Sequence, residues 1–120
     1  AIAIPAYSDY TIKSRVSEGA SMSGAAKTAV DIFYSENGTL TGAFGPSTLG
    51  ISAAGEYKAK YVSAVAVAQS GVITITLKSD TTIGLGDAVG DDIVYTPTEN
   101  GSALQWSVSG TVPAKYLPKT

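Results

Sequence analysis

Residues 6–36 read AYSDYTIKSRVSEGASMSGAAKTAVDIFYSE, and the rest of the architecture is built around this stretch. Its apolar side chains recur close to every 3.6 residues, which is typical of an amphipathic α-helix. They are Ile12, Val16, Ala20, Met22, Ala26, Ala29, Val30 and Phe33. The pattern predicts one long helix over residues 6–36, ended by Asn37-Gly38 as a left-handed cap.

The polar positions of this helix support the same assignment. Opposite charges stand four residues apart in the pairs Asp9/Lys13 and Lys27/Asp31, so we expect each pair to meet on the solvent face. Gly19 and Gly24 interrupt the middle, where each glycine costs roughly 1 kcal/mol relative to alanine. We therefore expect another element to approach closely there, or the helix to bend.

The amino-acid composition changes after the helix. Residues 37–56 are rich in turn formers and are expected to form a surface loop packed through Leu40, Phe44, Leu49 and Ile51. Residues 57–108 are expected to form four strands joined by turns at 69–71 and 99–102 and by a Gly/Asp-rich loop at 79–91. The predicted strands are 57–67, 72–78, 93–96 (ended by Pro97) and 103–108.

The alternation within these strands indicates which face is buried. Ile73, Ile75 and Leu77 share one face of the second strand, and Leu104, Trp106 and Val108 share one face of the fourth.

Together these elements predict an α+β fold. The long helix lies on one face of a four-stranded antiparallel sheet in a single domain, 1–120, and the tail 109–120 lies over the sheet. A helix of ~45 Å is longer than such a sheet is wide. Its first two turns should therefore project beyond the domain and contact a partner.

The chain opens with Ala1-Ile-Ala-Ile-Pro5, which carries no capping residue and no signal-peptide pattern. We expect these residues to continue a longer hydrophobic helix, since a membrane span needs ~20 apolar residues. A frayed end or a short strand is the alternative. Within a longer helix, Pro5 would remove one backbone hydrogen bond and introduce a kink.

Composition excludes much chemistry. The chain of 120 residues has no Cys and no His, so it has no ligands for zinc–thiolate or haem sites and no thiol or histidine for catalysis. Charged residues make up 15% of the chain, against roughly 25% in ordinary proteins. The pairs Lys13–Ser14 and Lys78–Ser79 lack a surrounding catalytic motif. We expect neither an enzyme nor a cofactor.

The stretch from Ala1 to Gly19, with Ala-Ile-Ala-Ile-Pro-Ala-Tyr and Arg15-Val-Ser-Glu18, resembles the N-terminal helix of type IVa pilins. The ending Val112-Pro-Ala-Lys-Tyr-Leu-Pro-Lys119 and the position of Trp106 resemble the same family. These motifs cover about the first twenty and the last fifteen residues. The fold implied by the resemblance is a long helix on a four-stranded antiparallel sheet, as derived above.

The resemblance implies a structural subunit of an extracellular bacterial pilus. It implies self-assembly into a helical filament, with Ile2, Ile4, Pro5, Tyr7 and Tyr10 as candidate subunit contacts. Anchoring in the inner membrane before assembly and handling by the pilus assembly machinery are also implied. Adhesion to surfaces or host cells, twitching motility, biofilm formation and DNA uptake are the outputs of such filaments.

One feature departs from the family. Type IVa pilins usually carry a C-terminal disulfide, but Val108 occupies the expected position of the first Cys and the chain shows no second one. Either the natural protein lacks this bridge, or these 120 residues have lost it. Without the bridge, a closed loop worth ~3 kcal/mol is missing, and packing through Tyr116 and Leu117 is expected to compensate.

Other motifs are weighed against simpler explanations. Asp80, Asp87, Asp91 and Asp92 could suggest calcium binding, but their spacing matches no EF-hand and a solvated loop is favoured. Packing explains the helix aromatics Tyr7, Tyr10, Phe33 and Tyr34 better than charge transport does. Turn chemistry explains the glycosylation sequons at Asn37 and Asn100.

A basic stripe from Lys58, Lys60, Lys78, Lys115 and Lys119 could bind DNA only weakly, at a net charge of −2. A major pseudopilin of a type II secretion system, with a calcium-binding loop, and a minor pilin remain as alternatives. A lone hydrolase domain would need a pocket with paired carboxylates.

Overall fold

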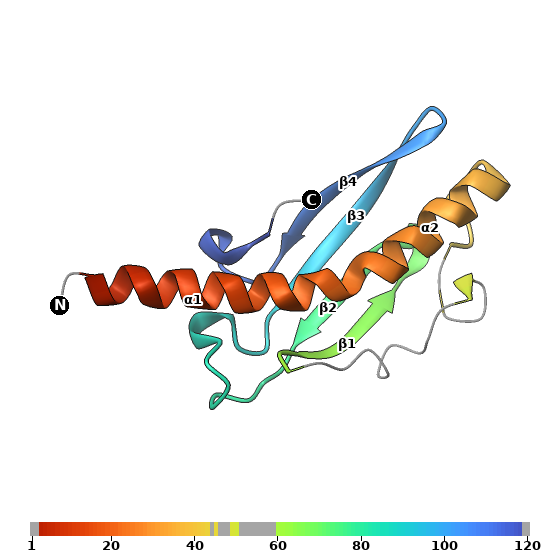
Figure 1. Cartoon of the computed structure of the whole chain (residues 1–120). Helices are drawn as coiled ribbons and strands as arrows, with labels where there is room; N and C mark the ends of the chain where they lie inside the picture. The colour runs from red at the N-terminus through yellow and green to blue at the C-terminus, as the bar shows by residue number, and fades with distance from the viewer. Residues whose placement is uncertain (1–2, 44, 46–48, 51–59, 119–120) are drawn as a thin grey trace.

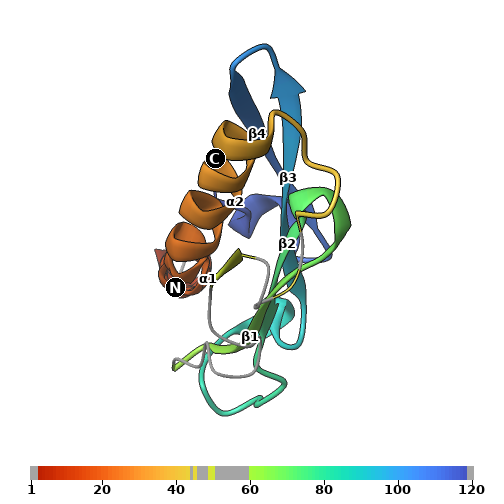
Figure 2. The same cartoon turned by 90° about the vertical axis from the view of Figure 1, so that its right-hand side faces the viewer.

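The computed structural model describes residues 3–43, 45, 49–50 and 60–118, with side chains from Asp9 onward. A long N-terminal helix lies on one face of a four-stranded antiparallel sheet, so the predicted α+β fold is confirmed (Figures 1 and 2). The helical elements are α1 (Ala3–Ala20), the 3₁₀ turn η1 (Ser21–Ser23) and α2 (Gly24–Asn37). The strands β1 (Val62–Val67), β2 (Ile73–Leu77), β3 (Asp92–Asn100) and β4 (Ala103–Gly110) follow in the order β1-β2-β3-β4.

The expected single helix over 6–36 is interrupted at η1. The hydroxyls of Ser21 and Ser23 donate hydrogen bonds to the carbonyls of Glu18 and Ala20, at 2.6 and 2.8 Å. Serines that bond back to the preceding turn compete with the helical ladder and bend helices. The predicted cap at Gly38 is confirmed, with φ +70° and its N–H bonded to the Tyr34 carbonyl at 2.8 Å.

The sheet follows the predicted alternation, with Ile73, Ile75 and Leu77 fully buried along β2. The predicted first strand, 57–67, is described only from Lys60, and β1 begins at Val62 after a bend. The β3–β4 hairpin turns through Gly101 and Ser102, because Asn100 pairs with Ala103. Gly101 has φ +64°, which a glycine at the first position of a tight hairpin turn tolerates.

The prediction that Pro97 ends the third strand is wrong. β3 continues to Asn100, and Pro97 pairs with Trp106 of β4. The pairing of β2 with β3 stops at Ile73 and Tyr95, so at Pro97 the strand has a neighbour on one side only. A proline without an N–H is tolerated at such an edge position.

Two apolar clusters join the helix to the sheet. The main core contains Ile12, Val16 and Ala20 of α1, the buried faces of β1–β3, and Leu85 and Ala88 from the loop between β2 and β3. The second cluster contains Val30 and Tyr34 of α2 with Leu40 and Ala43. Of the predicted loop anchors, Leu40 is buried and Leu49 is partly buried, whereas Phe44 and Ile51 lie outside the described residues.

The C-terminal tail lies against α1, and this corrects the expectation that it lies over the sheet. A short 3₁₀ turn, η5 (Ala114–Tyr116), contacts α1, and the Tyr116 side chain is only 2% exposed. Val112 and Tyr116 both belong to the main core, so the tail closes one side of it. The predicted packing of Tyr116 is confirmed.

The molecule is elongated along the helix, with extents of 55 × 28 × 17 Å. The N-terminal turns of α1 extend past the sheet and the tail, as the sequence predicted (Figure 1). Among the described residues, no helix has both the length and the apolar character of a membrane span.

Candidate functional site: the exposed helix surface

Tyr10, which lies at the base of the projecting turns of α1, is the main candidate contact. Its side chain is 75% exposed, the largest exposure of any large apolar residue in the described chain. It borders a shallow depression of about 220 Å³ with Lys13, Ser14 and Ser17. Of the other candidate contacts, Ile2 lies outside the described residues. Ile4, Pro5 and Tyr7 lie in α1 with side chains outside the described part.

Directly beside Tyr10, the tail is fastened to the helix through three polar side chains, here named the tail cluster: Asp9, Lys115 and Tyr116. The Tyr116 hydroxyl donates to Asp9 Oδ1 at 3.1 Å, and Lys115 Nζ donates to the same oxygen at 3.4 Å. The Tyr116 hydroxyl and then the Asp9 carboxylate raise the pKa of Lys115. The predicted Asp9–Lys13 pair is therefore not formed, because Asp9 turns to the tail instead.

The loop between β2 and β3 is fixed to the same helix. Arg15 donates from one guanidinium nitrogen to the Gly84 carbonyl at 2.7 Å. Gly84 has φ +81°, and a Cβ at this position would collide with the guanidinium group. The loop predicted as a solvated segment therefore packs a backbone carbonyl against α1.

On the other half of the helix, α2 is joined to β3 and β4 through aromatic contacts. Lys27 Nζ lies 3.6 Å from the centre of the Tyr95 ring, and Trp106 Nε1 donates to Asp31 Oδ1 at 3.3 Å. Burial lowers the pKa of Lys27 against the opposing effect of Asp31, and burial raises the pKa of Tyr95. Lys27 and Asp31, which were expected to pair on the solvent face, thus each contact an aromatic side chain of the sheet.

The buried aromatic of α2 is Tyr34, whereas sequence analysis assigned the core position to Phe33. The Tyr34 hydroxyl donates to the Gly101 carbonyl at 2.6 Å, which ties α2 to the β3–β4 hairpin. Phe33 is half-buried at the margin of the second cluster. Trp106, also expected in the core, is half-buried and packs against both clusters.

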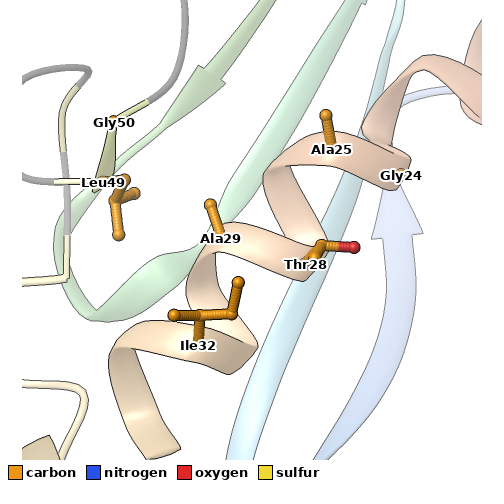
Figure 3. A pocket seen from close by; sticks show the side chains of 7 residues that line it. All are labelled: Gly24, Ala25, Thr28, Ala29, Ile32, Leu49 and Gly50. Carbon is orange, nitrogen blue, oxygen red and sulfur yellow. The ribbon is translucent and has the colours of Figure 1, made fainter. Parts of the chain in front are cut away.

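A groove beside α2 is the feature that sequence reasoning missed. It has a volume of about 430 Å³, and Ile32, 52% exposed, borders it. Figure 3 shows Ile32, Ala29 and Ala25 in succession along α2, with Leu49 of the facing segment on the opposite side. We name it the α2 groove, and its lining residues are Gly24, Ala25, Thr28, Ala29, Ile32, Leu49 and Gly50. The available signal was Ile32, an apolar residue outside the predicted buried stripe.

The remaining candidates form no site among the described residues. The Asp80 carboxylate accepts hydrogen bonds from the backbone and hydroxyl of Thr82, which lower its pKa. Within the described part of the chain, no group of three acidic side chains converges as a metal site requires. The suggested basic stripe is interrupted where Lys115 binds Asp9, and Lys58 and Lys119 lie outside the described residues.

Comparison with known proteins gives a consistent picture. A family model described as Pilin (bacterial filament) matches residues 12–120. The fimbrial protein EcpC of Eikenella corrodens is 37% identical over 124 residues, which cover 100% of this chain and 76% of that protein.

Relatives from Neisseria match a shorter segment. A fimbrial protein of Neisseria meningitidis serogroup B is 37% identical over 79 residues, covering 66% of this chain and 45% of the relative. A type IV major pilin protein PilE1 of Neisseria gonorrhoeae is 40% identical over 80 residues, covering 67% and 36%. The matched segments thus span less than half of each Neisseria protein.

Proposed function

The chain belongs to the pilin family of bacterial filament proteins, and we propose that it assembles with copies of itself into an extracellular type IV pilus through its projecting N-terminal helix. Pilins are structural proteins and not enzymes, in agreement with the expectation from composition. Family membership alone does not say which surface joins two subunits, and we propose that the projecting N-terminal helix provides it.

The observation that carries the proposal is the contrast along α1. Ile12, Val16 and Ala20 are buried in the main core, whereas Tyr10 lies 75% exposed just before them. Large aromatic side chains at exposed positions are favoured anchors in protein interfaces. The base of the projecting turns therefore presents an exposed aromatic side chain to a neighbouring subunit.

The biological context extends the same proposal. The relatives are named fimbrial proteins and type IV major pilins, so we place this chain in a pilus exported by a dedicated assembly machinery after an inner-membrane stage. Ile2, Ile4, Pro5 and Tyr7 are proposed to continue the contact surface of Tyr10. Adhesion, twitching motility and biofilm formation are the proposed outputs.

DNA uptake is not among the proposed outputs that the charge of this chain favours. Adhesion, twitching motility and biofilm formation need no affinity of the subunit for DNA. The net charge is −2, and Lys115 is engaged by Asp9. A pseudopilin with a calcium loop is not proposed, because the described acidic residues do not converge on a common point.

The test uses cells that express the full gene product. Deleting the gene should remove surface filaments seen by electron microscopy, and Tyr10→Ala should lower the sheared-filament yield about tenfold, as loss of an interface anchor of more than 1 kcal/mol does. The matched control is Gln105→Ala, an exposed change on β4. Unchanged filaments in the deletion strain would show that this chain is not the major subunit. Normal yield from Tyr10→Ala would remove Tyr10 from the interface.

A further inference from the structure

Tyr10 and Ile32 are the two large apolar side chains that the described chain leaves exposed, and they lie on different halves of the same long helix. We propose that Tyr10 of one subunit inserts into the α2 groove of the next subunit, beside Ile32. This contact rests on the proposed filament function and specifies which two surfaces meet.

The α2 groove suits an aromatic ring. Its α2 side is built from glycine, two alanines and a threonine, so a neighbouring helix can approach closely, and Ile32 and Leu49 provide apolar walls (Figure 3). None of its described lining residues is charged. A tyrosine there would bury its ring against apolar groups while its hydroxyl stays at the rim, which is the usual position of interface tyrosines.

Charge complementarity selects the orientation of the two copies. Tyr10 and Ile32 are 22 positions apart, so two parallel helices in this contact are offset along their axes by about 33 Å. At that offset Lys13, three residues after Tyr10, lies at the level of Ser35 and Glu36 of the neighbour. Antiparallel helices would instead place Lys13 opposite Ala29.

The angular positions agree with this pairing. Residues three and four positions along a helix lie on opposite sides of the starting residue, at about −60° and +40°. On two helices that face each other, Lys13 and Glu36 therefore fall on the same side of the contact, and Ser14 and Ser35 on the other. Lys13 and Glu36 are both exposed, and neither forms an ion pair with another described residue.

Symmetry favours the same arrangement. The contact joins two different patches of the chain, and heterologous contacts that do not close on themselves generate open helical filaments. All subunits then point the same way along the fibre, as the parallel pairing of Lys13 with Glu36 requires.

Cross-linking tests the contact directly, because the chain contains no Cys. Filaments of the full gene product carrying both Tyr10→Cys and Ile32→Cys, treated with a short bifunctional thiol reagent, should yield a ladder of dimers, trimers and longer species. Tyr10→Cys combined with Gln105→Cys is the control and should yield no ladder. Filaments that assemble from the first double variant without a ladder would overturn the proposal.

A second pair covers the case in which the first variant does not assemble. Lys13→Cys with Glu36→Cys keeps the aromatic anchor and should give the same ladder, and its absence in assembled filaments counts equally against the contact.

Charge reversal gives an independent readout. Lys13→Glu alone and Glu36→Lys alone should each lower filament yield about fivefold, the effect of losing an exposed ion pair of roughly 1 kcal/mol. The double reversal should restore the yield, whereas Lys13→Glu with Glu18→Lys should not. Failure of the double reversal to restore it would refute the parallel pairing. A strain without filaments even for the unmodified chain would instead refute the filament function itself.

Discussion

The two halves of the long helix are held to the rest of the molecule by different means. α1 enters the main core through Ile12, Val16 and Ala20 and is fastened on its outer side by the charged tail cluster. α2 contacts a smaller cluster through Val30 and Tyr34 and is joined to β3 and β4 by aromatic side chains.

This difference indicates a division of roles within one helix. The half that we propose to contact neighbouring subunits is also the half that packs into the main core through Ile12, Val16 and Ala20. A force on its projecting turns would therefore be transmitted to the main core. The half that carries the α2 groove also buries three side chains, Ala26, Val30 and Tyr34, but two of them belong to the smaller second cluster. We therefore expect α2 to be the less stable half, and the first experiment below tests this expectation. The two that follow test the contacts at the bend and at the tail cluster.

The largest expected effect comes from truncating one leucine in each cluster. Leu77→Ala in the main core should lower the free energy of unfolding by about 4 kcal/mol, and Leu40→Ala in the second cluster by about 2 kcal/mol. The smaller loss is expected because fewer buried side chains surround Leu40. Urea denaturation of the purified protein measures both, and equal losses would show that Leu40 is packed as completely as Leu77.

Smaller changes in stability are expected from alanine at the two glycines near the bend, and the two changes should have opposite signs. A Cβ at Gly19 would lie 2.9 Å from Val62 Cγ2, so Gly19→Ala should destabilise by about 1–2 kcal/mol through overpacking. A Cβ at Gly24 meets no atom within 4 Å, so Gly24→Ala should stabilise by about 0.5–1 kcal/mol. Thermal unfolding followed by circular dichroism reports both, and a stabilising Gly19→Ala would contradict the close approach of α1 to the sheet.

The smallest effect concerns pH and the tail cluster. The Tyr116 hydroxyl and the Asp9 carboxylate raise the pKa of Lys115 above its ordinary 10.5. The contribution of Lys115 to stability is therefore complete below pH 10.5 and is lost as the pH rises through the higher value of the folded state. As the pH rises above 10.5, the free energy of unfolding of Lys115→Ala should therefore fall less than that of the unmodified protein, as measured by urea denaturation at each pH.

The control for this pH experiment is Lys13→Ala, on the same helix but outside the tail cluster. Its alkaline profile should follow that of the unmodified protein. Parallel profiles for Lys115→Ala and the unmodified protein would show that the tail cluster adds nothing to stability.

Features set by local periodicity were predictable from the sequence. The buried face of the helix, apart from Tyr34, and the alternation along β2 follow from spacing, and the cap at Gly38 follows from the Asn-Gly pair. The end of β3 was not predictable from Pro97. A proline is tolerated in a strand where one side has no neighbouring strand, and the sequence does not show that β2 ends before it reaches Pro97.

Contacts between distant segments were also beyond local patterns. Asp9 had a partner four residues away, yet it binds Lys115 and Tyr116 from the other end of the chain. Tyr10 was identified because it is a large aromatic on a projecting helix. The α2 groove was missed because its far wall, Leu49, comes from a loop whose position relative to α2 no periodicity encodes.

The 3₁₀ turn at Ser21–Ser23 has a geometric consequence for assembly. A 3₁₀ turn advances about 120° per residue and an α-helix about 100°, so these three residues rotate the surface of α2 by about 60° relative to that of α1. In a filament joined by Tyr10 and the α2 groove, the angle between those two surfaces determines the rotation from one subunit to the next. In such a filament the hydroxyls of Ser21 and Ser23 would contribute to the twist of the whole fibre.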